Sequence, residues 1–163
     1  LSSYLTQQGA ILGLHSSYYK LSTNKLDGFS QLSTLNSKLN RCHFLRCSIE
    51  KLQALVAAGV TDDYSMGFAD AVGFRLQTTR PVRWIDPINF KLTSLTLHPL
   101  TIMDRTLNDK RYMNLSEEEA YCYCQQLIDK VRQYNGELTL LWHNTSVNST
   151  YLGSLYSSLL DTL

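Results

Sequence analysis

The sequence predicts an α/β fold with about five or six mostly parallel strands and flanking helices, arranged as an open sheet or an incomplete barrel. Short apolar runs alternate with segments in which apolar residues recur every three or four positions. Such alternation favours parallel pairing, because each crossover returns the chain to the same edge of the sheet. The 163 residues, 44% of them hydrophobic, are enough for one domain with its own core. We therefore expect a single domain over 1–163.

The first half of the chain is expected to contain three helices and two strands. Gly9 ends a helix over 1–8, in the usual position of a C-terminal glycine. Leucines three and four residues apart predict a helix over 29–39. Ser48 caps a further helix, which Gly59 ends. Apolar runs predict a strand at 10–14 and another that begins at 60–62.

The second half continues the alternation. Glycines and irregular spacing predict a loop over 63–81. Strands are expected at 83–85, 94–97 and 138–142. Ser116 and the glutamates that follow it form a capping box, which opens a helix to about Tyr134. A last helix is expected over 151–160.

Composition excludes several classes of partner. Fifteen Lys and Arg against fourteen Asp and Glu leave a net charge of +1, and no basic stripe points to a nucleic acid. The longest apolar runs, such as 52–60, are far shorter than the ~20 residues that span a bilayer. We find no secretory signal and expect neither a membrane nor a nucleic-acid partner. The chain begins at Leu1 rather than at Met, so we expect it to be the later part of a longer protein.

The four cysteines are expected to be free thiols in a reducing, cytoplasmic compartment. They are Cys42, Cys47, Cys122 and Cys124, and none forms a Cys-x-x-Cys pair. A zinc or redox site is the alternative.

The histidines give the first functional indication. His15, His98 and His143 each close an apolar strand, and His43 lies in the segment 41–45. Since the carboxyl ends of parallel strands line the active sites of α/β proteins, the set predicts a metal or acid–base site. The alternative is that each is an ordinary loop histidine, and His98, followed by Pro99, is the weakest member.

Polar and aromatic residues near these points are further candidates. Asp63 can hold a ligand histidine or the substrate, or simply end a strand. Arg41 can bind a carboxylate through two hydrogen bonds, or be a solvated cation. Asp104 offers another carboxylate, or belongs to a surface turn. Four aromatic side chains offer stacking faces for a sugar, or belong to the core: Tyr18, Tyr19, Trp84 and Trp142.

Four segments, in order, resemble motifs of the polysaccharide deacetylase family of metal-dependent carbohydrate esterases. They are Gly13-Leu14-His15-Ser16, Arg41-Cys42-His43-Phe44, the stretch 59–68 with Asp62-Asp63-Tyr64-Ser65, and Leu141-Trp142-His143. The residues 63–68, 73–75, 103–104 and 141–144 look like a divergent bacterial branch of that family. The likeness covers nearly the whole chain and implies an incomplete (β/α) barrel of the polysaccharide deacetylase type.

The resemblance implies a reaction and its residues. The substrate is an acetylated carbohydrate, and hydrolysis of the amide carbon–nitrogen bond releases acetate from an amino sugar. A divalent metal, zinc in our expectation, activates a water molecule. His15, with His43, is the implied metal ligand, and His143 is the implied general acid. Arg41 and Asp63 are implied to orient the reacting groups.

Tyr19 and Trp142 complete the implied set as substrate-binding residues. The sequence departs from the family at three places. The strand that ends in an Asp-Asp pair does not precede Leu1, so we expect the partner of this chain to be a missing amino-terminal segment of the same domain. Tyr19 stands where the family has a second histidine, and His43 replaces a proline.

These departures keep alternatives open. We expect residues 1–163 alone not to turn over substrate, because the mechanism needs the missing carboxylates. A non-catalytic carbohydrate-binding or scaffold relative, which has lost the metal triad, is the second hypothesis. A different metal-dependent hydrolase on an α/β barrel is the third.

Overall fold

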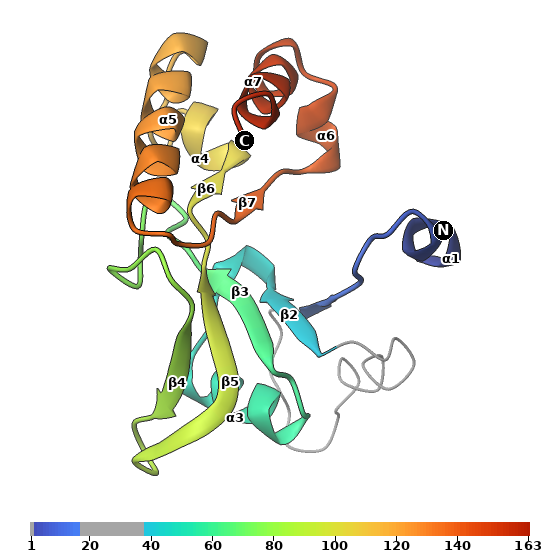
Figure 1. Cartoon of the computed structure of the whole chain (residues 1–163), viewed down its shortest axis with the longest axis vertical. Helices are drawn as coiled ribbons and strands as arrows, with labels where there is room; N and C mark the ends of the chain where they lie inside the picture. The colour runs from blue at the N-terminus through green and yellow to red at the C-terminus, as the bar shows by residue number, and fades with distance from the viewer. Residues whose placement is uncertain (1, 17–37) are drawn as a thin grey trace. The chain divides into compact units, whose positions relative to one another are not determined.

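A computed structural model describes residues 2–16 and 38–163, which form an α/β structure with a mostly parallel five-stranded sheet (Figure 1). The strands lie in the order β1-β2-β3-β5-β4, and a second, two-stranded sheet pairs β6 with β7. Their bounds are β1 Leu14–Ser16, β2 Leu39–Cys42, β3 Asp62–Met66, β4 Val82–Asp86, β5 Lys91–Pro99, β6 Ile102–Met103 and β7 Leu140–Leu141. The predicted α/β class with mostly parallel strands is confirmed.

The chain divides into two compact units. Unit 1 comprises 1–65 and 82–97, and unit 2 comprises 66–81 and 98–163. Unit 1 holds most of the five-stranded sheet with α1 (Ser2–Gln7), η1 (His43–Leu45) and α3 (Ile49–Ala57). Unit 2 holds the two-stranded sheet with α4 (Asp104–Asn108), α5 (Glu117–Gln133), α6 (Asn144–Val147) and α7 (Thr150–Leu160).

In unit 1 the parallel register places polar residues side by side. Here the register pairs Ser16 with Cys42, and Asn40 with Asp63. Helix α3 begins where the sequence predicts, because the Ser48 side chain accepts a hydrogen bond from the backbone N–H of Lys51.

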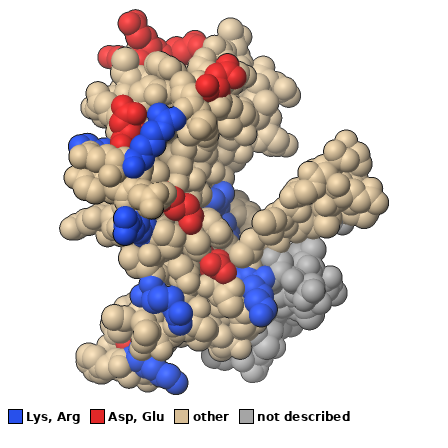
Figure 2. All heavy atoms as spheres, in the orientation of Figure 1, with Lys and Arg blue, Asp and Glu red and all other residues tan. Residues whose placement is uncertain are grey.

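The core of unit 2 is built by the helices α4, α5 and α7 and the strand β6. Its buried residues are Ile102, Leu107, Ala120, Cys124, Ile128, Leu155 and Leu159. Each fully buried large aliphatic side chain contributes roughly 1.5–3 kcal/mol relative to an exposed one. The predicted capping box of α5 is present, with Ser116 and Glu119 exchanging hydrogen bonds. Figure 2 shows the acidic first turn of this helix at the top of the view.

β4 and β5 depart from the parallel pattern and form an antiparallel hairpin. Asp86 stabilises the turn, since its Oδ1 accepts hydrogen bonds from the backbone N–H groups of Ile88 (2.9 Å) and Asn89 (3.3 Å). No helix among the described residues has the length and apolar character needed to cross a bilayer.

Several predicted boundaries are wrong. The first strand begins only at Leu14, and β7 is shorter than the predicted 138–142. The predicted helix over 29–39 lies mostly outside the described residues, but its last residue, Leu39, starts β2. The predicted loop over 63–81 begins with strand residues, because β3 runs to Met66. β3 carries Asp63 and Ser65 inward, so its apolar alternation is absent.

Candidate functional site

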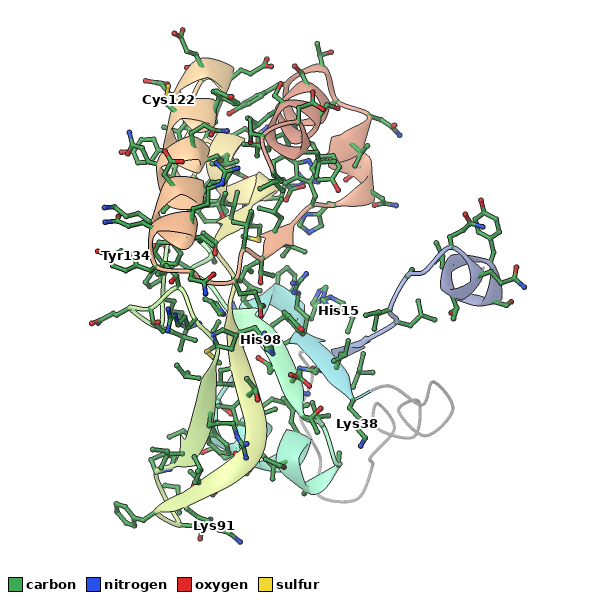
Figure 3. The ribbon with its side chains drawn as sticks, in the orientation of Figure 1. His15, Lys38, Lys91, His98, Cys122 and Tyr134 are labelled. Carbon is green, nitrogen blue, oxygen red and sulfur yellow. The ribbon has the colours of Figure 1, made fainter. Side chains whose placement is uncertain are left out.

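Two of the four histidines meet in unit 1. His15 lies on β1, and His43 is the first residue of η1, directly after β2. Nε2 of His15 is 2.7 Å from Nδ1 of His43, a hydrogen-bond distance, and the ring centroids are 4.9 Å apart. The register of β1 and β2 pairs His15 with Arg41, two residues before His43. The structure thus brings together the two predicted metal ligands, of which His15 is labelled in Figure 3.

The turn after β2 has an unusual backbone. Phe44 and Leu45 have φ values of 56° and 54°, in the left-handed region that side-chain-bearing residues avoid at a cost of roughly 1–2 kcal/mol each. Leu45 is buried, which helps to offset this cost. The turn leads to Cys47, whose Sγ lies 3.5 Å from Sγ of Cys42.

These two thiols and a carboxylate form what we call the thiol–carboxylate cluster: Cys42, Cys47 and Asp63. Ligand atoms of the three lie within 4.8 Å of one another. Asp63 is fully buried and Cys42 is 1% exposed. Within 2–16 and 38–163 this is the group of three or more His, Cys, Asp or Glu side chains arranged to hold a metal ion.

Neutral polar side chains surround the cluster. Oδ2 of Asp63 accepts hydrogen bonds from Nδ2 of Asn40 (2.6 Å) and Oγ of Ser65 (2.9 Å), and Oδ1 accepts one from the Ser65 N–H (3.0 Å). Sγ of Cys42 accepts weaker ones from Asn40 (3.5 Å) and Ser16 (3.6 Å). Oδ1 of Asn40 is buried without a hydrogen-bond partner in the described structure.

The cluster shifts the ionisation of its members. The hydrogen bond between the two thiols lowers the pKa of Cys42 to about 6 and raises the pKa of Cys47. Burial raises the pKa of Asp63, against the effect of its hydrogen bonds from Asn40 and Ser65. Cys42 is therefore the sulfur that ionises first.

Arg41 lies beside this cluster on β2. Its Nε donates a hydrogen bond to the Tyr64 carbonyl oxygen (3.1 Å), and the guanidinium lies 5.9 Å from the centroid of the Tyr64 ring. Burial lowers the pKa of Arg41, and the electrostatic attraction of Asp63 opposes that effect. Arg41 and Asp63 are therefore close enough to interact electrostatically in unit 1.

In unit 2, His143 pairs with Asp104. The ring Nδ1 of His143 lies 2.7 Å from Oδ1 of Asp104, and the His143 backbone N–H donates to Oδ2 (2.8 Å). The Arg105 N–H also donates to Oδ1 (2.6 Å). Asp104 is fully buried, which corrects the alternative that it belongs to a surface turn, whereas the His143 side chain is 44% exposed. A carboxylate accepts, so Nδ1 carries the proton and Nε2 is left for exchange.

The fourth histidine, His98, also pairs with a carboxylate in unit 2. Its Nδ1 lies 2.8 Å from Oε1 of Glu137. The His98 side chain is only 10% exposed, and the Glu137 side chain is 35% exposed. This arrangement suits a structural hydrogen bond inside the unit.

The predicted aromatic residues have different environments. Tyr18 and Tyr19 lie outside the described residues. Trp84 is buried. Trp142 is half-buried against the core of unit 2, its ring centroid is 5.2 Å from that of Tyr156, and its Nε1 is buried without a hydrogen-bond partner in the described structure. The ring of Trp142 therefore packs largely within the unit.

Sequence reasoning missed two features. It preferred free thiols to a zinc or redox site for the cysteines, although Cys42 stands between Arg41 and His43 at the end of a strand. It did not weigh the pairing of Asp104 with His143, although both follow parallel strands, β6 and β7. In each case the signal was a ligand-type residue at a strand end.

Comparison of the chain with models of protein families, with curated proteins and with solved structures gives no match. The likeness to polysaccharide deacetylases therefore rests on the sequence motifs alone.

Proposed function

We propose that this chain belongs to a hydrolase that removes acetyl groups from amino sugars or related glycans, with His143 as the general acid. One observation carries the proposal: the His143 ring is held by a fully buried carboxylate while 44% of its side chain remains exposed. An imidazole fixed at Nδ1 presents Nε2 for proton transfer, as acid–base catalysis requires.

The proposed chemistry of unit 2 is a single proton transfer. Protonated Nε2 of His143 gives its proton to the departing amine as the bond between the acetyl carbon and nitrogen breaks. Water adds its hydroxyl to the acetyl carbon, and the proton that the water loses returns through solvent to Nε2 of His143, so that acetic acid and the free amine are released. Asp104 acts as a positioning residue, since it touches His143 through both the ring and the backbone. The proposal also takes the sheet as part of an incomplete barrel of the polysaccharide deacetylase type, which the order of parallel strands supports.

The resemblance implies a divalent metal, which we propose to be zinc, but the predicted histidine pair fits it incompletely. Catalytic zinc sites usually have three protein ligands. His15 and His43 supply two, and no third donor of the His, Cys, Asp or Glu type joins them among the described residues. We therefore assign no step to a metal at this pair. We propose that Arg41 and Asp63, both in unit 1, orient the reacting groups.

An NMR titration of the 163-residue chain tests the proposal. We expect an N-acetylated chito-oligosaccharide to shift the ring signals of His143, and the deacetylated oligosaccharide to shift them less. The buried ring of His98 is the internal control. His143 signals that stay unchanged at saturating oligosaccharide would contradict the proposal. Acetate release by this chain alone would contradict its expected inactivity, and His143→Ala should then lower the rate by roughly 10²–10⁴-fold.

A cavity in unit 2 favours the second candidate function, carbohydrate binding without catalysis. Its volume is about 700 Å³, within the usual range of ligand sites. Aromatic rings that suit the face of a sugar line it, together with polar side chains: Phe74, Tyr123, Tyr134, Gln77, Gln126 and Lys130. In the same titration, binding that is lost in Tyr123→Ala and kept in His143→Ala favours this candidate.

A further inference from the structure

The interior of the parallel strands in unit 1 is unusually polar. The buried face of a sheet is normally lined by apolar side chains. Here β1, β2 and β3 instead carry inward Ser16, Asn40, Cys42, Asp63 and Ser65, each at most 2% exposed. Buried polar groups cost free energy unless they are satisfied, so this concentration requires a compensating interaction.

The spacing of the two sulfurs matches a bridging ion better than a disulfide. Two thiolates on one tetrahedral zinc, with bonds of about 2.3 Å, are about 3.8 Å apart. The Sγ atoms of Cys42 and Cys47 are 3.5 Å apart. A disulfide would need them to approach to about 2.05 Å.

The hydrogen bonds around the cluster are those of an outer coordination shell. Ligating carboxylates and thiolates are typically held by further donors that fix their orientation. Asn40 donates to both Asp63 and Cys42, and Ser65 donates to Asp63 twice. Asn40 is 2% exposed and its Oδ1 has no partner in the described structure, so the polar shell is incomplete as it stands.

The charges also balance around a divalent ion. Two thiolates and a carboxylate carry three negative charges. An ion of charge +2 neutralises two of them and leaves one negative charge. Arg41, which attracts Asp63 electrostatically, can compensate that remaining charge. The backbone turns after β2 with positive φ values at Phe44 and Leu45, and this turn places Cys47 beside Cys42.

We propose that Cys42, Cys47 and Asp63 form a binding site for a thiophilic divalent ion, Zn²⁺, distinct from the His15–His43 pair. Thiolate ligands select such ions over Mg²⁺ and Ca²⁺. Three protein ligands leave the fourth tetrahedral position for water or an added ligand, and the partly exposed Cys47 gives access to it.

Cobalt substitution of the full, reduced 163-residue chain tests this site. Co²⁺ bound by thiolates gives a charge-transfer absorption that imidazole and carboxylate ligands do not. We expect one Co²⁺ per chain with this absorption, displaced by Zn²⁺. Cys47→Ser and Asp63→Asn should weaken binding by more than the roughly 10–100-fold caused by loss of an outer-shell partner.

The controls separate this site from every other donor. Cys122→Ser changes a cysteine on the exposed side of α5 and should leave the absorption unchanged (Figure 3). His15→Ala with His43→Ala should also leave it unchanged. Circular dichroism checks that each variant is folded, and the partly exposed Cys47 keeps the test valid if a change at the buried Cys42 or Asp63 prevents folding.

Three results would overturn the proposal: no charge-transfer band in the folded, reduced chain, a band that survives Cys47→Ser, or a band lost only in the double histidine variant. The readout does not involve acetyl hydrolysis, so it stands or falls independently of the proposed function.

Discussion

Two histidine–carboxylate pairs in unit 2 share one hydrogen-bond geometry and differ in burial. The Nδ1–oxygen distances are 2.8 Å for His98–Glu137 and 2.7 Å for His143–Asp104. In the first pair the histidine is the buried partner, at 10% exposure against 35%. In the second the carboxylate is fully buried and the histidine is 44% exposed.

The difference shows that contact distance alone does not identify a functional histidine. The buried member of each pair is held in place by its surroundings, and the exposed member is presented to solvent. His98 therefore completes the interior of unit 2, whereas the buried Asp104 binds the ring and the backbone N–H of the more exposed His143. Burial of the carboxylate rather than of the ring is the property that favours an acid–base role.

The largest expected effect distinguishes the two carboxylates. Asp104→Ala should lower the free energy of unfolding by about 3 kcal/mol, because three N–H donors lose a buried acceptor. Glu137→Ala should cost about 1–2 kcal/mol, because Glu137 is partly exposed and mainly His98 loses its partner. Urea denaturation followed by circular dichroism measures both. Equal losses would remove the proposed contrast between the pairs.

The histidines should respond in the opposite order. His98→Ala should cost about 2 kcal/mol, since it removes a buried ring and leaves Glu137 without this contact. His143→Ala should cost about 1 kcal/mol, because Asp104 keeps its two backbone donors. The same denaturation experiment compares them. A larger loss at His143 than at His98 would assign His143 a structural role.

Local signals were read correctly from the sequence. Ser48, Ser116, Gly9 and Gly59 mark helix ends, and each acts within a few residues, so no tertiary information was needed. The proximity of His15 to His43 followed from the rule that parallel strands align their carboxyl ends.

Features that depend on burial were not predictable in this way. β3 was missed beyond its first residue, because Asp63 and Ser65 point inward and hide the apolar alternation of a strand. The contacts of Cys42 and Asp104 were missed for the same reason, because a single sequence does not show which polar side chains a fold will cover.

The smallest predicted effect on stability concerns Asp86, a carboxylate that is held by amide donors rather than by a histidine. It can be compared with the two histidine–carboxylate pairs. Hydrogen bonds from Gln53 and Asn89 lower the pKa of Asp86, in unit 1, to about 2. Since an unfolded aspartate has a pKa near ~3.9, the folded protein holds the proton less tightly than the unfolded chain. The contribution of Asp86 to stability is therefore complete above about pH 4 and is lost as the pH falls through about 2.

Asp86→Asn isolates this contribution, because asparagine keeps an acceptor for the turn N–H groups but does not titrate. We expect the wild-type chain to be more stable than the variant between pH 5 and 7. Over this range the difference should be constant and comparable to the contribution of one hydrogen-bonded carboxylate. The difference in melting temperature should shrink from about pH 4 towards pH 2. A difference that stays constant down to pH 2 would mean that neutral amide donors do not hold the Asp86 carboxylate.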